Sequence, residues 1–245
     1  MNTALIFAGG AGQRMNSRSK PKQFIELRGK PIIIYTLEHF EAHPKIDCIV
    51  VACLKGWINE LQMLLTRYNI HKVNKIVPGG VTGFESIYKA LASLANVCAD
   101  DDIVLIHDGV RPFITKELIS ANIKMVAEYG AVITVEPATE SVVRSKDGMI
   151  IDNVPARSTM FIAKAPQSFR FSFIWSLYQR AKNDGITTID SAHLLSIYGE
   201  KMYTIQSSPN NIKITTPVDY YIFRALNDAM EIQQIFGIEI DNSFV

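Results

Sequence analysis

The sequence is poor in three features that often reveal a protein's class: cysteine, net charge and long apolar runs. Its 245 residues include three cysteines, none of them in a CxxC pair, which predicts a reduced protein without a structural zinc site. The formal net charge of +1 excludes the strong basic excess typical of proteins that bind nucleic acid or anionic membranes over a broad surface. Any anion site must therefore be local.

Targeting segments are lacking as well. The stretch MNTALIFAGG has neither the charged start nor the long apolar stretch of a secretory signal. Nor does the sequence contain a run of about 20 apolar residues, the length that crosses a bilayer. We therefore expect a cytoplasmic protein.

What the chain does contain is an alternation of strand-like and helix-like segments. This alternation is typical of βαβ units around a mainly parallel sheet, so it predicts a Rossmann-like α/β fold. Apolar runs predict strands at 4–7, 48–52, 75–77, 103–107, 131–135 and 202–206. Helical spacing of apolar residues predicts helices over 57–68, 87–94, 118–126, 171–182, 190–198 and 217 to about 234.

Residues 139–165 interrupt this alternation. The stretch SVVRSKDGMIIDNVPAR has two short β-rich runs around Asp147 and Gly148, and an Asp-Gly pair favours a hairpin turn. A lone hairpin is marginally stable and must pack on something else. The pattern leaves open an arm that pairs with a second subunit and an edge hairpin on its own domain. We assign residues 1–245 to a single domain, with 139–165 as a dimerisation arm.

A glycine-rich turn follows the first predicted strand. In IFAGGAGQRM, the glycines leave backbone N–H groups unobstructed, as phosphate binding requires. The turn lacks the Gly-Lys-Ser/Thr ending of the Walker pattern. Met15 stands where the dinucleotide pattern needs its third glycine, and no acidic residue ends the second strand to bind a ribose. An NAD-dependent oxidoreductase is thus a weakened alternative.

Cationic side chains flank this turn. Arg14 and Lys22 suit a triphosphate whose negative charge grows at the α-phosphate and the departing pyrophosphate. Arg18 and Lys20 have the simpler interpretation of surface cations. Arg157 or Lys213 alone would be interpreted as a surface cation. Five cationic residues together predict a phosphate-rich site: Arg14, Lys22, Arg111, Arg157 and Lys213.

A second cluster ends the predicted strand 103–107, in IVLIHDGVRPF. Ligands of open α/β sheets bind beyond the carboxyl ends of the strands, so Asp108 is expected to face the same crevice as the glycine turn. Its carboxylate could bind Mg²⁺, directly or through water, or accept a hydrogen bond from a sugar hydroxyl. The structural alternative is a turn-closing aspartate. His107 is interpreted as structural, and the glycines of VPGGVTGFES leave room for a base or ribose.

Six stretches, in order, carry a family resemblance: AGGAGQRM, PKQF, PGG with ES, HDGVRPF, PQSF and NIKITTP. They resemble the cytidylyltransferases that join CTP to a small polyol phosphate, either methylerythritol phosphate or ribitol 5-phosphate. The resemblance runs from about residue 4 to residue 225. It implies a single domain of the nucleotide-diphospho-sugar transferase type and a homodimer that exchanges its arms. With the carboxylate of Asp108 at the predicted site, we expect a divalent metal such as Mg²⁺ as the cofactor.

The resemblance also implies a role for each matching residue. The implied catalytic residues are Arg14 and Lys22, which would stabilise the α-phosphate in the transition state. The implied substrate-binding residues are Asp108, Arg111, Arg157 and Lys213, with Asp108 also a metal ligand and Arg157 reaching the partner's site. The residues expected to hold CTP are Phe7, Ala8, Gly9, Gly10, Ala11, Gly12, Gly79, Gly80, Ser86 and Gly109.

Three departures bear on the substrate. Gly83 stands where the family usually has an arginine, and Ala165 replaces the threonine of a Thr-Pro-Gln motif. The sequence Ile189-Asp190-Ser191 replaces the Thr-Asp-Glu run common in methylerythritol enzymes. We therefore expect an alditol phosphate, D-ribitol 5-phosphate, in preference to methylerythritol phosphate. A non-catalytic nucleotide-binding protein is the remaining alternative.

Overall fold

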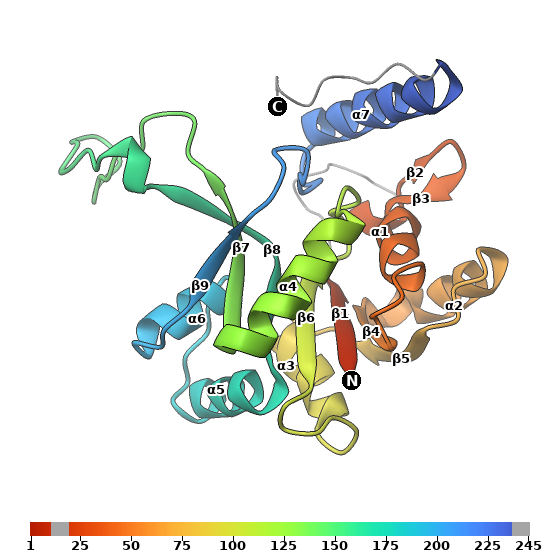
Figure 1. The fold of residues 1–245 in the computed structure, drawn as a ribbon, viewed down its shortest axis with the longest axis horizontal. Coiled ribbons are helices and arrows are strands. Elements are labelled where there is room, and N and C mark those ends of the chain that lie inside the picture. The colour runs from red at the N-terminus through yellow and green to blue at the C-terminus, as the bar shows by residue number, and fades with distance from the viewer. Residues whose placement is uncertain (11–19, 237–245) are drawn as a thin grey trace.

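The computed structural model describes residues 1–10 and 20–236, and a seven-stranded sheet lies at its centre (Figure 1). The strand order is β5-β4-β1-β6-β8-β7-β9. Among the described strands of this sheet, β8 runs antiparallel to β6 and β7, and the other neighbouring pairs are parallel. The strands are β1 (Asn2–Ala8), β4 (Cys48–Cys53), β5 (Val73–Pro78), β6 (Ile103–Asp108), β7 (Ala131–Pro137), β8 (Phe161–Arg170) and β9 (Tyr203–Gln206). The predicted mainly parallel α/β fold is confirmed.

Helices cover both faces of the sheet, which explains why its central strands are continuous apolar runs. In β1, Ala4 and Ile6 belong to the core on one face, and Leu5 belongs to the core on the other. The first face packs against α1 (Ile32–Glu41), α2 (Ile58–Arg67) and α4 (Lys116–Tyr129). The second packs against α3 (Gly83–Leu94), α5 (Phe171–Asn183) and α6 (Ser191–Ile197). Among the described residues, no helix combines the length and apolar character needed to span a bilayer.

The chain reverses its direction of travel across the sheet beside β1. It runs from β1 to β4 and β5 on one side, then returns to pair β6 with the other side of β1. The register places Phe7 opposite Asp108 at the carboxyl ends of these two strands. Such a switch point is where open α/β sheets form a ligand crevice.

A small third core supports the segments around this crevice. Phe223 of α7 (Pro217–Phe236) is fully buried in it, together with Val110 and Ile214, which follow Asp108 and Lys213 closely in the chain. A two-stranded ribbon of β2 (Glu26–Leu27) and β3 (Lys30–Pro31) joins the same core. Short 3-10 helices complete the described structure: η2 (Lys22–Phe24), η3 (Lys55–Trp57) and η4 (Arg157–Thr159).

The region expected to form a hairpin arm contains less β-structure than predicted. The green and teal segment leading into β8 extends away from the sheet (Figure 1). It contains one antiparallel bridge, between Arg144 and Asn153, in place of two strands. The Asp147 carboxylate accepts hydrogen bonds from the backbone N–H groups of Met149 and Ile150, so it stabilises the turn locally without forming a ladder. Residues 161–165 of the expected arm belong to β8.

Candidate active site

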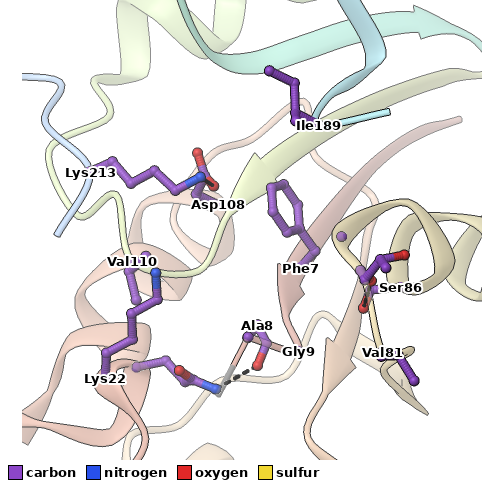
Figure 2. Close-up of a pocket in the computed structure, with 14 residues that line it drawn as sticks. Phe7, Ala8, Gly9, Lys22, Val81, Ser86, Asp108, Val110, Ile189 and Lys213 are labelled. Atoms are coloured by element: carbon purple, nitrogen blue, oxygen red, sulfur yellow. Dashed lines mark hydrogen bonds and ion pairs between the residues drawn. The ribbon is translucent and has the colours of Figure 1, made fainter. Parts of the chain in front are cut away.

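A pocket of about 280 Å³ lies at the carboxyl ends of β1 and β6 (Figure 2). The residues predicted to hold CTP that line it are Phe7, Ala8, Gly9, Gly10 and Ser86. The predicted charged residues that line it are Lys22, Asp108 and Lys213. In the view of Figure 2, the two lysines lie on one side of Phe7, and Ser86 lies on the other. The structure thus brings together four stretches that are far apart in the sequence: residues 7–10 with Lys22, the region of Ser86, the region of Asp108 and the region of Lys213.

Two glycine loops approach each other closely on one wall of the pocket. A Cβ at Gly9 would lie 2.7 Å from the Ser86 hydroxyl oxygen and 3.4 Å from the Gly79 Cα. Ser86 is 2% exposed, and its hydroxyl accepts a hydrogen bond from the Gly80 N–H at 3.0 Å. Ser86 therefore fixes the loop before α3, which packs closely against the loop after β1, and a side chain at Gly9 would separate the two loops.

The loop before α3 is also held by a capping box. Thr82 accepts a hydrogen bond from the Glu85 N–H at 3.1 Å, and Glu85 Oε2 accepts one from the Val81 N–H at 2.8 Å. A Cβ at Gly80 would lie 2.1 Å from the Glu85 Cβ, so the capping box needs glycine there. Gly83 has nothing within 4 Å of a built Cβ.

Alanine at these two glycines should therefore have opposite effects. We expect Gly80→Ala to lower the free energy of unfolding by about 1–3 kcal/mol, because the methyl group must displace Glu85. Gly83→Ala is expected to raise it by about 0.4–1 kcal/mol, because it restricts the unfolded chain and adds no clash. Urea unfolding of both variants measures the difference. Equal effects of the two substitutions would contradict the capping geometry.

Asp108 is held between two cations. Its Oδ2 lies 3.1 Å from Arg111 Nε, with both side chains 6% exposed. Its Oδ1 lies 2.5 Å from Lys213 Nζ, and this ammonium group also lies 5.6 Å from the centre of the Phe7 ring. Arg111 Nη1 donates a further hydrogen bond to the Asn211 carbonyl at 2.6 Å. The buried carboxylate therefore sets the positions of both cations.

These charges fix the protonation states at the end of β6. Burial by itself would raise the pKa of Asp108, but Arg111 and Lys213 outweigh it and hold that pKa below its ordinary value. Burial lowers the pKa of His107 to about 3, so its ring is neutral near pH 7. The His107 Nε2–H donates to the Arg111 carbonyl at 3.1 Å. His107 is structural, as the sequence interpretation has it.

The remaining predicted residues lie outside this pocket. Arg111 lines an adjacent cavity of about 250 Å³ that shares Phe7, Asp108, Ile189 and Lys213 with the first. Gly79, Gly80 and Gly109 lie behind the lining, where they allow close backbone packing. Arg157 lies in the arm, where its Nη1 donates to the Thr139 carbonyl at 3.1 Å, and it lines neither cavity. Arg14, Ala11 and Gly12 lie outside the described residues.

Two buried polar residues of the site have no predicted role. Gln23 is 1% exposed, and its Nε2 donates to the Ala8 carbonyl at 2.6 Å, which ties the Lys22 segment to the end of β1. Asn211 is 1% exposed, and its Nδ2 donates to the Ala165 carbonyl at 2.7 Å, which ties the Lys213 segment to β8. The sequence signal was position alone: Gln23 directly follows Lys22 in PKQF, and Asn211 precedes Lys213 by two places in NIKITTP.

Comparison with known proteins agrees with this geometry. A family model described as 2-C-methyl-D-erythritol 4-phosphate cytidylyltransferase (IspD) matches residues 2–227. The chain belongs to the IspD family. The predicted nucleotidyltransferase class is confirmed, and the weaker NAD-dependent alternative has no support from this assignment.

Individual members of the IspD family differ in the substrate that their names state. The chain is 47% identical over 239 residues to a ribitol-5-phosphate cytidylyltransferase of Streptococcus agalactiae serotype III, with 97% of this chain and 100% of the relative covered. It is 39% identical to a 2-C-methyl-D-erythritol 4-phosphate cytidylyltransferase of Clostridium botulinum strain 657, with 89% and 93% covered. A crystal structure of 4-diphosphocytidyl-2C-methyl-D-erythritol synthase from Anaerococcus prevotii superimposes with a TM-score of 0.79 at 26% identity, covering 93% of this chain and 96% of that one.

Proposed function

We propose that the protein transfers the cytidylyl group of CTP to D-ribitol 5-phosphate, giving CDP-ribitol and pyrophosphate. The observation that carries this proposal is the 47% identity to a ribitol-5-phosphate cytidylyltransferase over the whole length of that relative. Identity to the methylerythritol enzyme is lower, at 39%. Ile189, which replaces a threonine of the methylerythritol enzymes, lines both cavities and is 87% exposed there, which supports a different acceptor pocket.

CTP occupies the 280 Å³ pocket in this proposal. Gly9 and Gly10 leave the backbone after β1 open to the triphosphate. The first turn of α3 also faces the pocket through Gly83 and Ser86, and a helix N-terminus favours an anion. The close approach of the two glycine loops gives this wall a fixed shape before the nucleotide binds.

No protein nucleophile is needed for the reaction. An oxygen of the alditol phosphate attacks the α-phosphorus of CTP, the bond from that phosphorus to the bridging oxygen of the β-phosphate breaks, and pyrophosphate leaves with the electron pair. Catalysis then consists of positioning and charge neutralisation. We assign Lys22 and Arg14 to the charge that develops on the α-phosphate, and Lys213 to the acceptor phosphate. Lys213 is partly exposed toward the pocket while Asp108 fixes its ammonium group, which supports this role.

A divalent metal such as Mg²⁺ fits this site if one protein carboxylate and the phosphates of the substrate hold it together. Within residues 1–10 and 20–236, no three His, Cys, Asp or Glu side chains lie close enough together to hold a metal ion by themselves. Asp108 lines the pocket as a single ionised carboxylate, and Mg²⁺ is commonly held by one or two carboxylates together with substrate phosphates. We propose that Asp108 would hold the metal, directly or through water, and that the bound metal would supply positive charge to the triphosphate.

The test of the proposed function is a pyrophosphate-release assay with CTP, Mg²⁺ and a panel of acceptors. We expect kcat/KM to be at least about tenfold higher for D-ribitol 5-phosphate than for 2-C-methyl-D-erythritol 4-phosphate, a difference of about 1.4 kcal/mol in transition-state binding. Glycerol 3-phosphate is the short-chain control. Preference for the methylerythritol substrate would assign the alternative function, and no turnover with any acceptor would favour a non-catalytic nucleotide-binding protein.

We further propose that the arm dimerises the protein and completes the site. Several apolar side chains of the arm are exposed, among them Met149 at 89% and Ile150 at 69%, and apolar surface of this kind favours a protein partner. Arg157 is far enough along the arm to line neither cavity of its own subunit, which supports a role in the partner's site.

Mixed dimers test this shared site. We expect Arg157→Ala homodimers to lose most activity, because the acceptor phosphate loses a cation. Each heterodimer that combines an Arg157→Ala subunit with a Lys22→Ala subunit should have about half the activity of a wild-type dimer, because one of its two sites then carries both residues. The two variants carry different tags, the heterodimers are purified through both tags after the subunits are mixed, and the turnover of these heterodimers is measured. Activity no higher than the sum of the two inactive homodimers would argue against sharing.

A further inference from the structure

A third cavity, of about 330 Å³, lies between α3 and the segment that connects α5 to α6; we call it the α3–α5 cavity. Its lining shares no residue with the substrate pocket. The side chains that shape it are Phe84, Tyr88 and Lys89 from α3, Lys182 from α5, and Ile186 from the connecting segment. Nothing in the proposed reaction uses this cavity.

The floor of the α3–α5 cavity is apolar and rigid. Phe84 is 5% exposed and stacks on the buried Tyr178, with ring centres 4.9 Å apart. Tyr88 packs against Trp175 at 5.2 Å. Such a floor binds the flat or aliphatic body of a small molecule by removing apolar surface from water.

The charged groups at the rim of the cavity are two lysine ammonium groups and one carboxylate that already accepts a backbone hydrogen bond. Lys182 Nζ lies 4.3 Å from the centre of the Tyr88 ring, which holds the ammonium over the cavity. Lys89 also lines the cavity and donates to the Gly79 carbonyl at 3.2 Å. Among the described residues of the lining, Glu85 is the one carboxylate, and its Oε2 accepts a hydrogen bond from the Val81 N–H of the capping box. The open rim is therefore cationic.

We propose that the α3–α5 cavity binds a small amphipathic anion, with its apolar body on Phe84 and Tyr88 and its carboxylate or phosphate against Lys89 and Lys182. Binding there weakens the binding of CTP. Lys89 is the link, because an anion that draws its ammonium away removes the hydrogen bond to the Gly79 carbonyl. Gly79 precedes Gly80, whose N–H is bonded to Ser86 in the substrate pocket. This coupling rests on the proposed function, whereas the binding itself does not.

Titration calorimetry of the full chain with 2-naphthoate tests the binding, and the neutral 2-naphthamide is the matched ligand. Lys182→Gln is expected to weaken 2-naphthoate binding about threefold to fivefold, as the loss of one exposed ion pair would. The double variant Lys89→Gln/Lys182→Gln should weaken it about tenfold or more. Arg180→Gln removes a cation from the same helix outside the cavity lining and should leave the affinity unchanged. Lys213→Gln, in the substrate pocket, should also leave it unchanged.

The coupling is tested by repeating the titration with saturating CTP. Binding free energies are reciprocal, so CTP should weaken 2-naphthoate binding by the same factor, about fivefold, by which 2-naphthoate weakens CTP. The proposed site would be overturned if 2-naphthoate did not bind, or if 2-naphthamide bound as tightly as 2-naphthoate. It would also be overturned if Lys213→Gln abolished 2-naphthoate binding while Lys182→Gln retained it. Binding that meets the variant pattern but is indifferent to CTP would overturn the coupling. A protein inactive with every acceptor that still binds 2-naphthoate in this pattern would contradict the proposed function and leave the site standing.

Discussion

Replacing Lys22 with alanine is expected to lower kcat by about 100- to 1,000-fold while changing the affinity for CTP by less than about threefold. Lys22 lines the pocket beside the glycine turn, on a 3-10 helix that Gln23 ties to the end of β1. A fixed cation aimed at charge that appears only in the transition state contributes to turnover more than to binding. Steady-state kinetics with CTP, Mg²⁺ and D-ribitol 5-phosphate measure kcat, and equilibrium titration measures CTP affinity.

Lys20 supplies the matched control for this experiment. It lies two residues before Lys22, and its Nζ pairs with Glu26 at 2.6 Å on the surface. Lys20→Ala should therefore change kcat by less than about twofold, because an exposed ion pair contributes little. A kcat for Lys22→Ala equal to that of the wild type would remove Lys22 from the catalytic role. Arg14, which lies outside the described residues, is expected to behave as Lys22 does.

Replacing Asp108 with alanine is expected to lower the free energy of unfolding by about 3–5 kcal/mol and to abolish turnover. The substitution leaves the Arg111 guanidinium buried without its carboxylate, and breaking one side of a buried ion pair has a cost of this size. It also releases Lys213 from its fixed position in the pocket. Urea unfolding measures the loss, with Asp228→Ala as control, because Asp228 pairs with Arg28 at the surface and should cost under about 1 kcal/mol.

The contribution of Asp108 to the free energy of unfolding should also depend on pH, and it should decrease on acidification. Its pKa in the folded protein is held below the value of about 3.9 expected in the unfolded chain, so the ionised carboxylate stabilises the fold above about pH 4. The stabilisation is lost as the pH falls through the folded pKa. The difference in unfolding free energy between wild type and Asp108→Asn should therefore shrink on acidification below pH ~4. A difference that grew on acidification would contradict the ion-pair arrangement.

The sequence predicted the parts of the fold whose signals are local. Strands such as 48–52 and 103–107 are buried on both faces and read as apolar runs, and the structure extends each by one residue. β8 was missed because its antiparallel pairing with β6 and β7 is a tertiary property of Phe161–Arg170. The helix Ile32–Glu41 was missed because six apolar residues among its ten obscure the helical period. In the arm, the Asp-Gly turn correctly predicted the chain reversal, but the strands beside it are reduced to one antiparallel bridge, because such a turn fixes only the turn.

The site shows the same division between local and long-range information. The glycine turns, Lys22 and Asp108 follow strand ends, so the sequence placed them in one crevice, where the structure has them. The ion pairs that join Asp108 to Arg111 and Lys213 depend on how Ile214 packs in the third core, which no local pattern encodes. Gln23 and Asn211 escaped notice for the same reason, since a single buried amide has no periodicity.

The measurement that tests the central claim most directly is the fate of an oxygen label. D-Ribitol 5-phosphate that carries ¹⁸O in its non-bridging phosphate oxygens is incubated with CTP, Mg²⁺ and the protein, and both products are analysed by ³¹P NMR and mass spectrometry. In-line attack of the alditol phosphate on the α-phosphorus predicts CDP-ribitol that retains all of the label, part of it in the bridge between the two phosphorus atoms, with unlabelled pyrophosphate. Label in the released pyrophosphate, or no CDP-ribitol at all, would contradict the account.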